Sequence, residues 1–186
     1  MRDDMTLEEE DILRQINQAF ADVGLDDGTS LNMTEYNDSG RCMPDFREKA
    51  KGDERDSWSV IPDETLEQFT VTFSFTDLKG FRFYIPAYMA WTIRNHHLSD
   101  SIIADNTVYA IDPAHYLFEE VPFADWFTKD QIAVMIRFLE YASHSENSLD
   151  VNVARDNLEK IGKAQSGSRG SLAPRPHPTG HGHQKL

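Results

Sequence analysis

The stretch from Thr70 to Met89 constrains the fold of this chain more than any other segment. Aromatic and β-branched residues alternate with other residues on both sides of a short polar segment, Asp77 to Gly80. This alternation predicts two β-strands, because successive side chains of a strand point to opposite faces. Gly80 suits the turn between them. The second run leads directly into Pro86, whose fixed φ suits the first position of a helix. The segment therefore predicts an antiparallel β-hairpin followed by a helix.

Helical patterns flank this predicted hairpin. Thr6 and Glu9 have the spacing of a capping box, and apolar residues then recur at helical spacing as far as Val23. Thr128 and Gln131 form a second capping box before another strongly amphipathic helix. A weaker helix is expected from about residue 149 to 161. Residues 107–111 are a candidate third strand. Helices on both sides of a short hairpin predict an α+β fold with about four helices.

The chain is expected to form one domain followed by a tail. Its 186 residues suit a single core, which we place in residues 1–162. Residues 163–186 are rich in Gly, Ser, Pro and His, a composition that predicts a disordered tail. The single cysteine, Cys42, and the acidic start without an apolar segment favour a cytoplasmic protein. No run approaches the ~20 apolar residues that cross a membrane.

The net charge of −14 narrows the range of partners. Four of the 18 basic residues follow Ile161, where there are no acids, so the preceding body carries a net charge of −18. A surface of this sign repels the phosphate backbone, which argues against nucleic-acid binding. It favours a basic protein partner through electrostatic steering, although acidic surfaces also serve solubility alone.

Several motifs resemble a known family. The most specific is the run Gly80-Phe-Arg-Phe-Tyr-Ile-Pro-Ala-Tyr-Met89, which follows Trp58-x-x-Ile61-Pro62 and Phe73-Ser-Phe75. Together with Ile16-x-x-Ala19-Phe20 and the capped helix up to Tyr141, these motifs resemble an uncharacterised bacterial family, domain of unknown function 6714. The resemblance implies a small bacterial cytoplasmic protein, and it assigns no catalytic residue.

The junction between the predicted hairpin and helix is the best candidate site. Ile85 cannot cap a helix that starts at Pro86, so the N–H groups that follow would be available to an anion. Arg82 and Tyr84 on the strand and Tyr88 on the helix would face this junction, with His96 at the far end. The alternative is that water or a nearby carboxylate satisfies these donors.

Catalytic and metal-binding motifs are missing from the sequence. It contains no G-x-S-x-G elbow, Walker loop or G-x-G-x-x-G motif. Adjacent histidines such as His96 and His97 point in different directions on most backbones, and a metal would need acids from elsewhere, such as Asp100 or Asp105. We therefore expect no catalytic residue, no metal and no cofactor. A metal-dependent role is the third hypothesis.

Aromatic residues exceed what one short hairpin needs. Most should be buried, but exposed ones beside acids would resemble a protein-binding patch. The leading hypothesis is a non-catalytic acidic protein-binding module, similar to immunity proteins or inhibitors. The alternative is a small-molecule or anion-binding enzyme that uses Arg82, Tyr84, Tyr88 and His96. The sequence leaves the oligomeric state open. The aromatic residues that exceed the needs of a hairpin are Trp58, Tyr84, Tyr88, Trp91, Tyr116, Phe123, Trp126 and Phe127.

Overall fold

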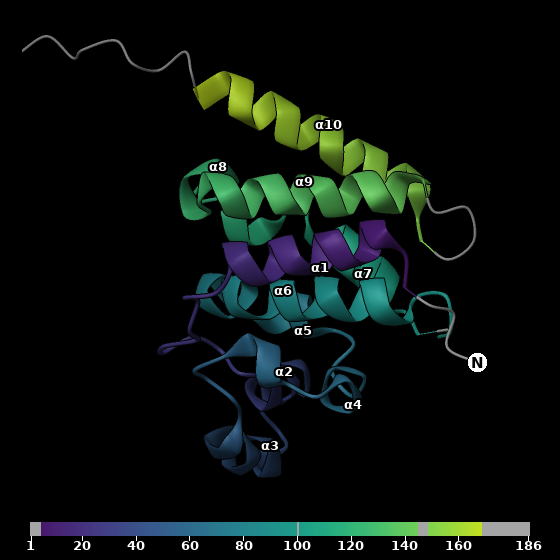
Figure 1. Cartoon of the computed structure of the whole chain (residues 1–186). Helices are drawn as coiled ribbons and strands as arrows, with labels where there is room; N and C mark the ends of the chain where they lie inside the picture. The colour runs from purple at the N-terminus through teal and green to yellow at the C-terminus, as the bar shows by residue number, and fades with distance from the viewer. Residues whose placement is uncertain (1–4, 100, 145–148, 169–186) are drawn as a thin grey trace, which may run out of the picture.

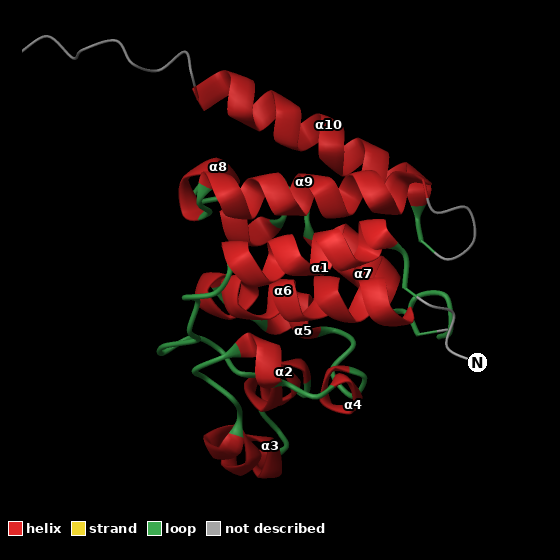
Figure 2. Cartoon of the chain, viewed as in Figure 1, coloured by secondary structure: helices red, strands yellow, loops and turns green. Residues whose placement is uncertain are grey.

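The computed structural model describes residues 5–99, 101–144 and 149–168, and this part of the chain folds into helices and loops (Figure 2). The longer helices form stacked layers, with α10 on α9, α9 on α1, and α1 and α7 on α6 (Figure 1). The α-helices are α1 Leu7–Ala19, α2 Leu31–Asp38, α3 Pro44–Lys49, α4 Asp63–Leu66, α5 Thr72–Phe75, α6 Leu78–Asn95, α7 Ile103–Ala110, α8 Phe123–Trp126, α9 Lys129–His144 and α10 Val151–Ser168. Short 3₁₀ helices lie at η1 Ala50–Gly52, η2 Trp58–Val60 and η3 Tyr116–Phe118.

The predicted α+β class and its hairpin are wrong. The first expected strand contains the short helix α5, and the second lies inside α6. Asp77 does not open a hairpin turn: its side chain accepts a hydrogen bond from the backbone N–H of Gly80 at 2.7 Å and caps α6. The described residues contain no strand, so nothing pairs as a sheet.

The alternation misled because α6 is buried on nearly all sides. From Gly80 to Ile93 every residue except Arg82 is buried, so the helix has no polar stripe at a 3.6-residue period. A continuous apolar run does not distinguish a strand from a buried helix by periodicity. Pro86 lies in the ninth position of α6, not at its start. It has no N–H for the Arg82 carbonyl, a defect that tertiary packing offsets.

The candidate third strand at residues 107–111 is also helical. Residues up to Ala110 belong to α7, which buries Ile103, Thr107 and Val108. The Thr107 hydroxyl donates to the Ile103 carbonyl one turn earlier, at 2.7 Å. β-branched residues are common in strands, but here they fill one buried face of a short helix that packs on α6.

The capped helices agree with their predictions. Thr6 and Glu9 form the capping box of α1, and Thr128 and Gln131 exchange the equivalent bonds before α9. The last helix extends further than expected, to Ser168, so residues 163–168 of the predicted tail are helical. The remaining tail, residues 169–186, lies outside the described residues.

A smaller layer of short helices and loops closes the other side of α6 (Figure 1). Two glycines allow the loop before α2 to approach the start of α6. A Cβ on Gly28 would lie 2.8 Å from the Lys79 Cβ, and one on Gly80 would lie 2.1 Å from the Thr76 hydroxyl oxygen. The loop packs against the backbone of α6 because both positions lack a side chain.

One cluster of buried apolar side chains runs from Ile12 to Ile161. Its centre is α6, where Trp91, Tyr84 and Phe81 are fully buried. Aromatic rings of Phe81, Phe118 and Phe127 contact one another where α6 meets the segment before α9. None of the described helices is long and apolar enough to cross a membrane.

Candidate functional site

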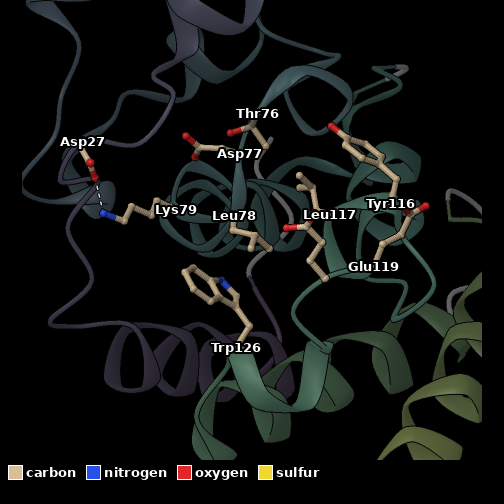
Figure 3. A pocket seen from close by; sticks show the side chains of 10 residues that line it. Asp27, Thr76, Asp77, Leu78, Lys79, Tyr116, Leu117, Glu119 and Trp126 are labelled. Carbon is tan, nitrogen blue, oxygen red and sulfur yellow. Dashed lines mark hydrogen bonds and ion pairs between the residues drawn. The ribbon is translucent and has the colours of Figure 1, made fainter.

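A broad pocket opens where the start of α6 meets η3 and α8 (Figure 3). Its volume is about 610 Å³. Residues from three separated parts of the chain form its wall, so the pocket depends on tertiary packing. The lining residues are Asp27, Thr76, Asp77, Leu78, Lys79, Tyr116, Leu117, Glu119, Glu120 and Trp126.

Two of the acids in this wall are paired within the protein. Asp77 accepts hydrogen bonds from the N–H of Gly80 at 2.7 Å and from both the N–H and the hydroxyl of Thr29 at 3.0 Å. Asp27 forms an ion pair with Lys79 (Figure 3). The Lys79 ammonium, through its hydrogen bond to Asp27, lowers the pKa of that carboxyl. These contacts hold the pocket's edge and neutralise Lys79, the one cation among the described lining residues.

Glu119 and Glu120 differ from these acids. Both are exposed, and neither carboxylate has a hydrogen-bond or ion-pair partner among the described residues. With Asp77, they leave the pocket with a clear excess of negative charge. Their negative potential is available to a ligand, because no cation among the described residues pairs with either carboxylate.

Apolar surface lies between these charges. Trp126 lies across from Leu78 and Leu117, and Tyr116 stands beside Leu117 (Figure 3). Tyr116 is 50% exposed. Two buried polar atoms of the wall, Trp126 Nε1 and Thr76 Oγ1, have no hydrogen-bond partner among the described residues. Most buried polar atoms in proteins are paired, so unused donor capacity gathers here.

Three of the predicted site residues lie on α6 and contact different groups. The Tyr84 hydroxyl accepts a hydrogen bond from the Leu31 N–H at 3.2 Å. The Tyr88 hydroxyl donates to the Phe69 carbonyl at 2.6 Å. Burial raises the pKa of both tyrosines, so both stay neutral. The partly buried Arg82 has no described partner for its Nε atom.

These residues do not form the predicted junction, because the junction does not exist. The N–H groups from Ala87 to Met89 lie in the middle of α6, not at a helix start. The free donors that would have held an anion are therefore absent from this segment.

The fourth predicted residue, His96, lies at the opposite end of α6 in a second polar cluster. Its Nε2 atom lies 2.7 Å from the Tyr141 hydroxyl, which donates to Glu9 Oε1 at 2.6 Å. His97 Nε2 lies 3.4 Å from the same carboxylate oxygen. The ring centroids of His96 and His97 are 3.6 Å apart, so the two side chains lie side by side and do not point in different directions as expected.

Electrostatics at this second cluster favour a neutral histidine beside a charged carboxylate. Burial and the neighbouring His97 lower the pKa of His96 to about 4, although Glu9 opposes the shift. Burial raises the pKa of Glu9, but hydrogen bonds from Tyr141 and Thr6 outweigh it and the net shift is downward. Of the acids proposed as metal partners, Asp105 instead accepts from the Asp150 N–H, and Asp100 lies outside the described residues.

Sequence reasoning missed most of both sites. Trp126 and Tyr116 were singled out only as surplus aromatics, and Glu119 and Glu120 were not singled out. Glu9 was recognised as a capping residue, which is true of its Oε2 atom, but its Oε1 atom faces the histidines. The doublet Glu119-Glu120 between aromatic segments was the available signal for the pocket.

The sequence model of a family of unknown function, DUF6714, matches residues 8–163. No curated protein and no solved structure matches the chain.

Proposed function

Because this chain belongs to DUF6714, a family of unknown function, we propose its role from its own surface. In this proposal the protein is non-catalytic, and it binds a basic segment of another protein at the pocket around Trp126. The observation that carries this proposal is that Glu119 and Glu120, which have no partner in the described part of the chain, lie beside half-exposed aromatic surface. As the resemblance implies, the setting we propose is the bacterial cytoplasm.

The chemistry of the pocket fits an arginine or lysine side chain. The aliphatic stem of such a residue would cover Leu78 and Leu117, while its charged end would reach Glu119 or Glu120. Arginine would gain most, because its planar guanidinium stacks on aromatic rings and binds carboxylates with two hydrogen bonds. Trp126 and Tyr116 supply such rings.

The charge of the whole molecule supports the same partner class. A body with a net charge of −18 attracts a basic segment over several ångströms before contact, which raises the association rate. This long-range attraction would weaken as salt is added, because the Debye length falls to about 8 Å at physiological ionic strength.

The test uses the pocket's carboxylates. Binding of a partner captured from cell lysate, and of short Arg-containing peptides measured by calorimetry, is compared among wild type, E119Q/E120Q and E10Q/E64Q. The last variant removes the same charge from exposed acids outside the pocket. We expect E119Q/E120Q to weaken binding by about tenfold, equivalent to about 1.4 kcal/mol, with E10Q/E64Q close to wild type. Equal effects of the two variants would reject the pocket as the binding site.

A further inference from the structure

We propose that Glu9, His96 and His97 bind one divalent metal ion, for which zinc is the best match. One donor atom from each residue lies within 4.8 Å of the other two. The cluster lies at the end of α6 opposite to the acidic pocket, about 27 Å away by the length of an 18-residue helix. It is therefore independent of the proposed partner site.

The donor set fits zinc by chemistry and by spacing. Two imidazoles and a carboxylate are a known ligand set for zinc sites that keep a fourth position open. Bonds of about 2.0–2.1 Å in a tetrahedron place neighbouring ligand atoms about 3.4 Å apart. The distance from Glu9 Oε1 is 3.4 Å to His97 Nε2 and 3.9 Å to His96 Nε2. The donor atoms of His96 and His97 lie within 4.8 Å of each other, so binding of an ion requires the three atoms to draw closer together.

The three ligands come from two firmly held positions. Glu9 is fixed at the third position of α1, because its Oε2 atom accepts from the Thr6 N–H at 2.7 Å and the Thr6 hydroxyl at 3.0 Å. His96 caps α6 through its own N–H, which donates to the Thr92 carbonyl at 3.0 Å. The packing of α1 on α6 therefore brings the ligands together before any metal arrives.

Tyr141 is a positioning residue for this site. Its hydroxyl donates to Glu9 Oε1 at 2.6 Å, which orients the carboxylate as outer-shell groups do in metal sites. Because the phenol proton goes to Glu9, the phenol oxygen accepts from His96 Nε2 at 2.7 Å, and an ion at this nitrogen requires the tautomer with the proton on Nδ1.

His97 supplies both access and a clean test. Its side chain is 56% exposed, whereas those of His96 and Glu9 are buried, so an ion would enter from the His97 side. Replacement of an exposed side chain leaves the core intact. The variant H97A should therefore fold normally and lose only the metal.

The experiment measures zinc binding to the full chain without an affinity tag, after chelator treatment. All proteins carry H177Q, H181Q and H183Q, so that the C-terminal histidines do not compete for zinc. We expect one zinc ion per chain in the parent protein. H97A should weaken binding more than 100-fold, while H144A, which removes another exposed histidine, should leave it unchanged.

A cobalt titration gives a second readout. The parent protein should develop the visible absorption of tetrahedral Co²⁺, and H97A should not. Y141F should keep this spectrum but weaken metal affinity about 10–100-fold, as expected for an outer-shell partner. The proposal fails if the parent binds no zinc, or if H97A and H144A bind it equally well.

Discussion

The Asp77 carboxylate joins the N–H of Gly80 to the N–H and hydroxyl of Thr29, so one side chain caps α6 and anchors the loop before α2. This relationship fixes where α6 begins. The same turn of α6 forms one edge of the acidic pocket, because Asp77, Leu78 and Lys79 all line the pocket. The first turn of the central helix therefore serves both the fold and the proposed binding surface.

Removal of this cap should destabilise the protein. We expect D77A to lower the free energy of unfolding by about 2 kcal/mol, the upper part of the range for a lost N-cap, because Thr29 also loses its acceptor. The measurement is urea denaturation followed by circular dichroism. D22A, at an exposed acid without a described partner, should change stability by less than about 0.5 kcal/mol. Equal values for the two variants would mean that Asp77 does not cap α6.

Two helical glycines should respond to alanine with opposite signs. At Gly80 an added Cβ would lie 2.1 Å from Thr76 Oγ1 and 2.6 Å from the Thr29 carbonyl oxygen. G80A should therefore destabilise the protein by more than about 1 kcal/mol, a cost typical of overpacking. At Gly162, in α10, nothing lies within 4 Å, so G162A should stabilise it by about 0.5–1 kcal/mol. Thermal unfolding of both variants provides the comparison, and a stabilising G80A would contradict the close approach.

His115 should make folding sensitive to mild acid. Burial lowers the pKa of His115, with Asp112 opposing the shift, and its Nδ1 atom accepts from the Leu117 N–H at 3.3 Å. The unfolded chain, with a pKa of about 6.5, binds this proton more readily. Stability should therefore fall as the pH drops below about 6.5.

The control for this pH effect is a pair of asparagine variants. H115N keeps an acceptor for Leu117 but does not titrate, so its stability should fall less steeply between pH 7 and pH 5 than that of wild type. H144N, at an exposed position on α9, should keep the wild-type slope. The neighbouring groups Asp112 and Tyr116 remain in both proteins. An H115N slope equal to that of wild type would exclude His115 as the source.

The sequence predicted those elements whose signals are local. The capping boxes at Thr6–Glu9 and Thr128–Gln131 define α1 and α9 because each lies within one turn and next to an amphipathic stripe. The central helix α6 has no such stripe, since it is buried around its circumference, and its aromatic alternation imitated a strand. A local pattern is therefore least informative where packing is most complete.

The sites were less predictable than the helices. Tyr141 and Glu9 are separated by 132 residues, and their contact depends on how α1 packs against α9. The pocket likewise joins Asp27, Lys79 and Trp126 from distant segments. No spacing rule links such residues in one sequence. The predicted residues Arg82, Tyr84 and Tyr88 were placed together only because a hairpin was assumed.

The most direct test of the proposed function is an NMR titration that follows the three tryptophan indole N–H signals. Trp58 donates to the Phe20 carbonyl at 2.8 Å and Trp91 to Glu67 at 3.3 Å, whereas Trp126 in the pocket has no described acceptor. The variant W126F assigns the pocket signal. Addition of an Arg-containing peptide should shift the Trp126 signal and leave those of Trp58 and Trp91 in place, and E119Q/E120Q should weaken the response. A Trp126 signal that stays unmoved while the peptide binds would contradict the account.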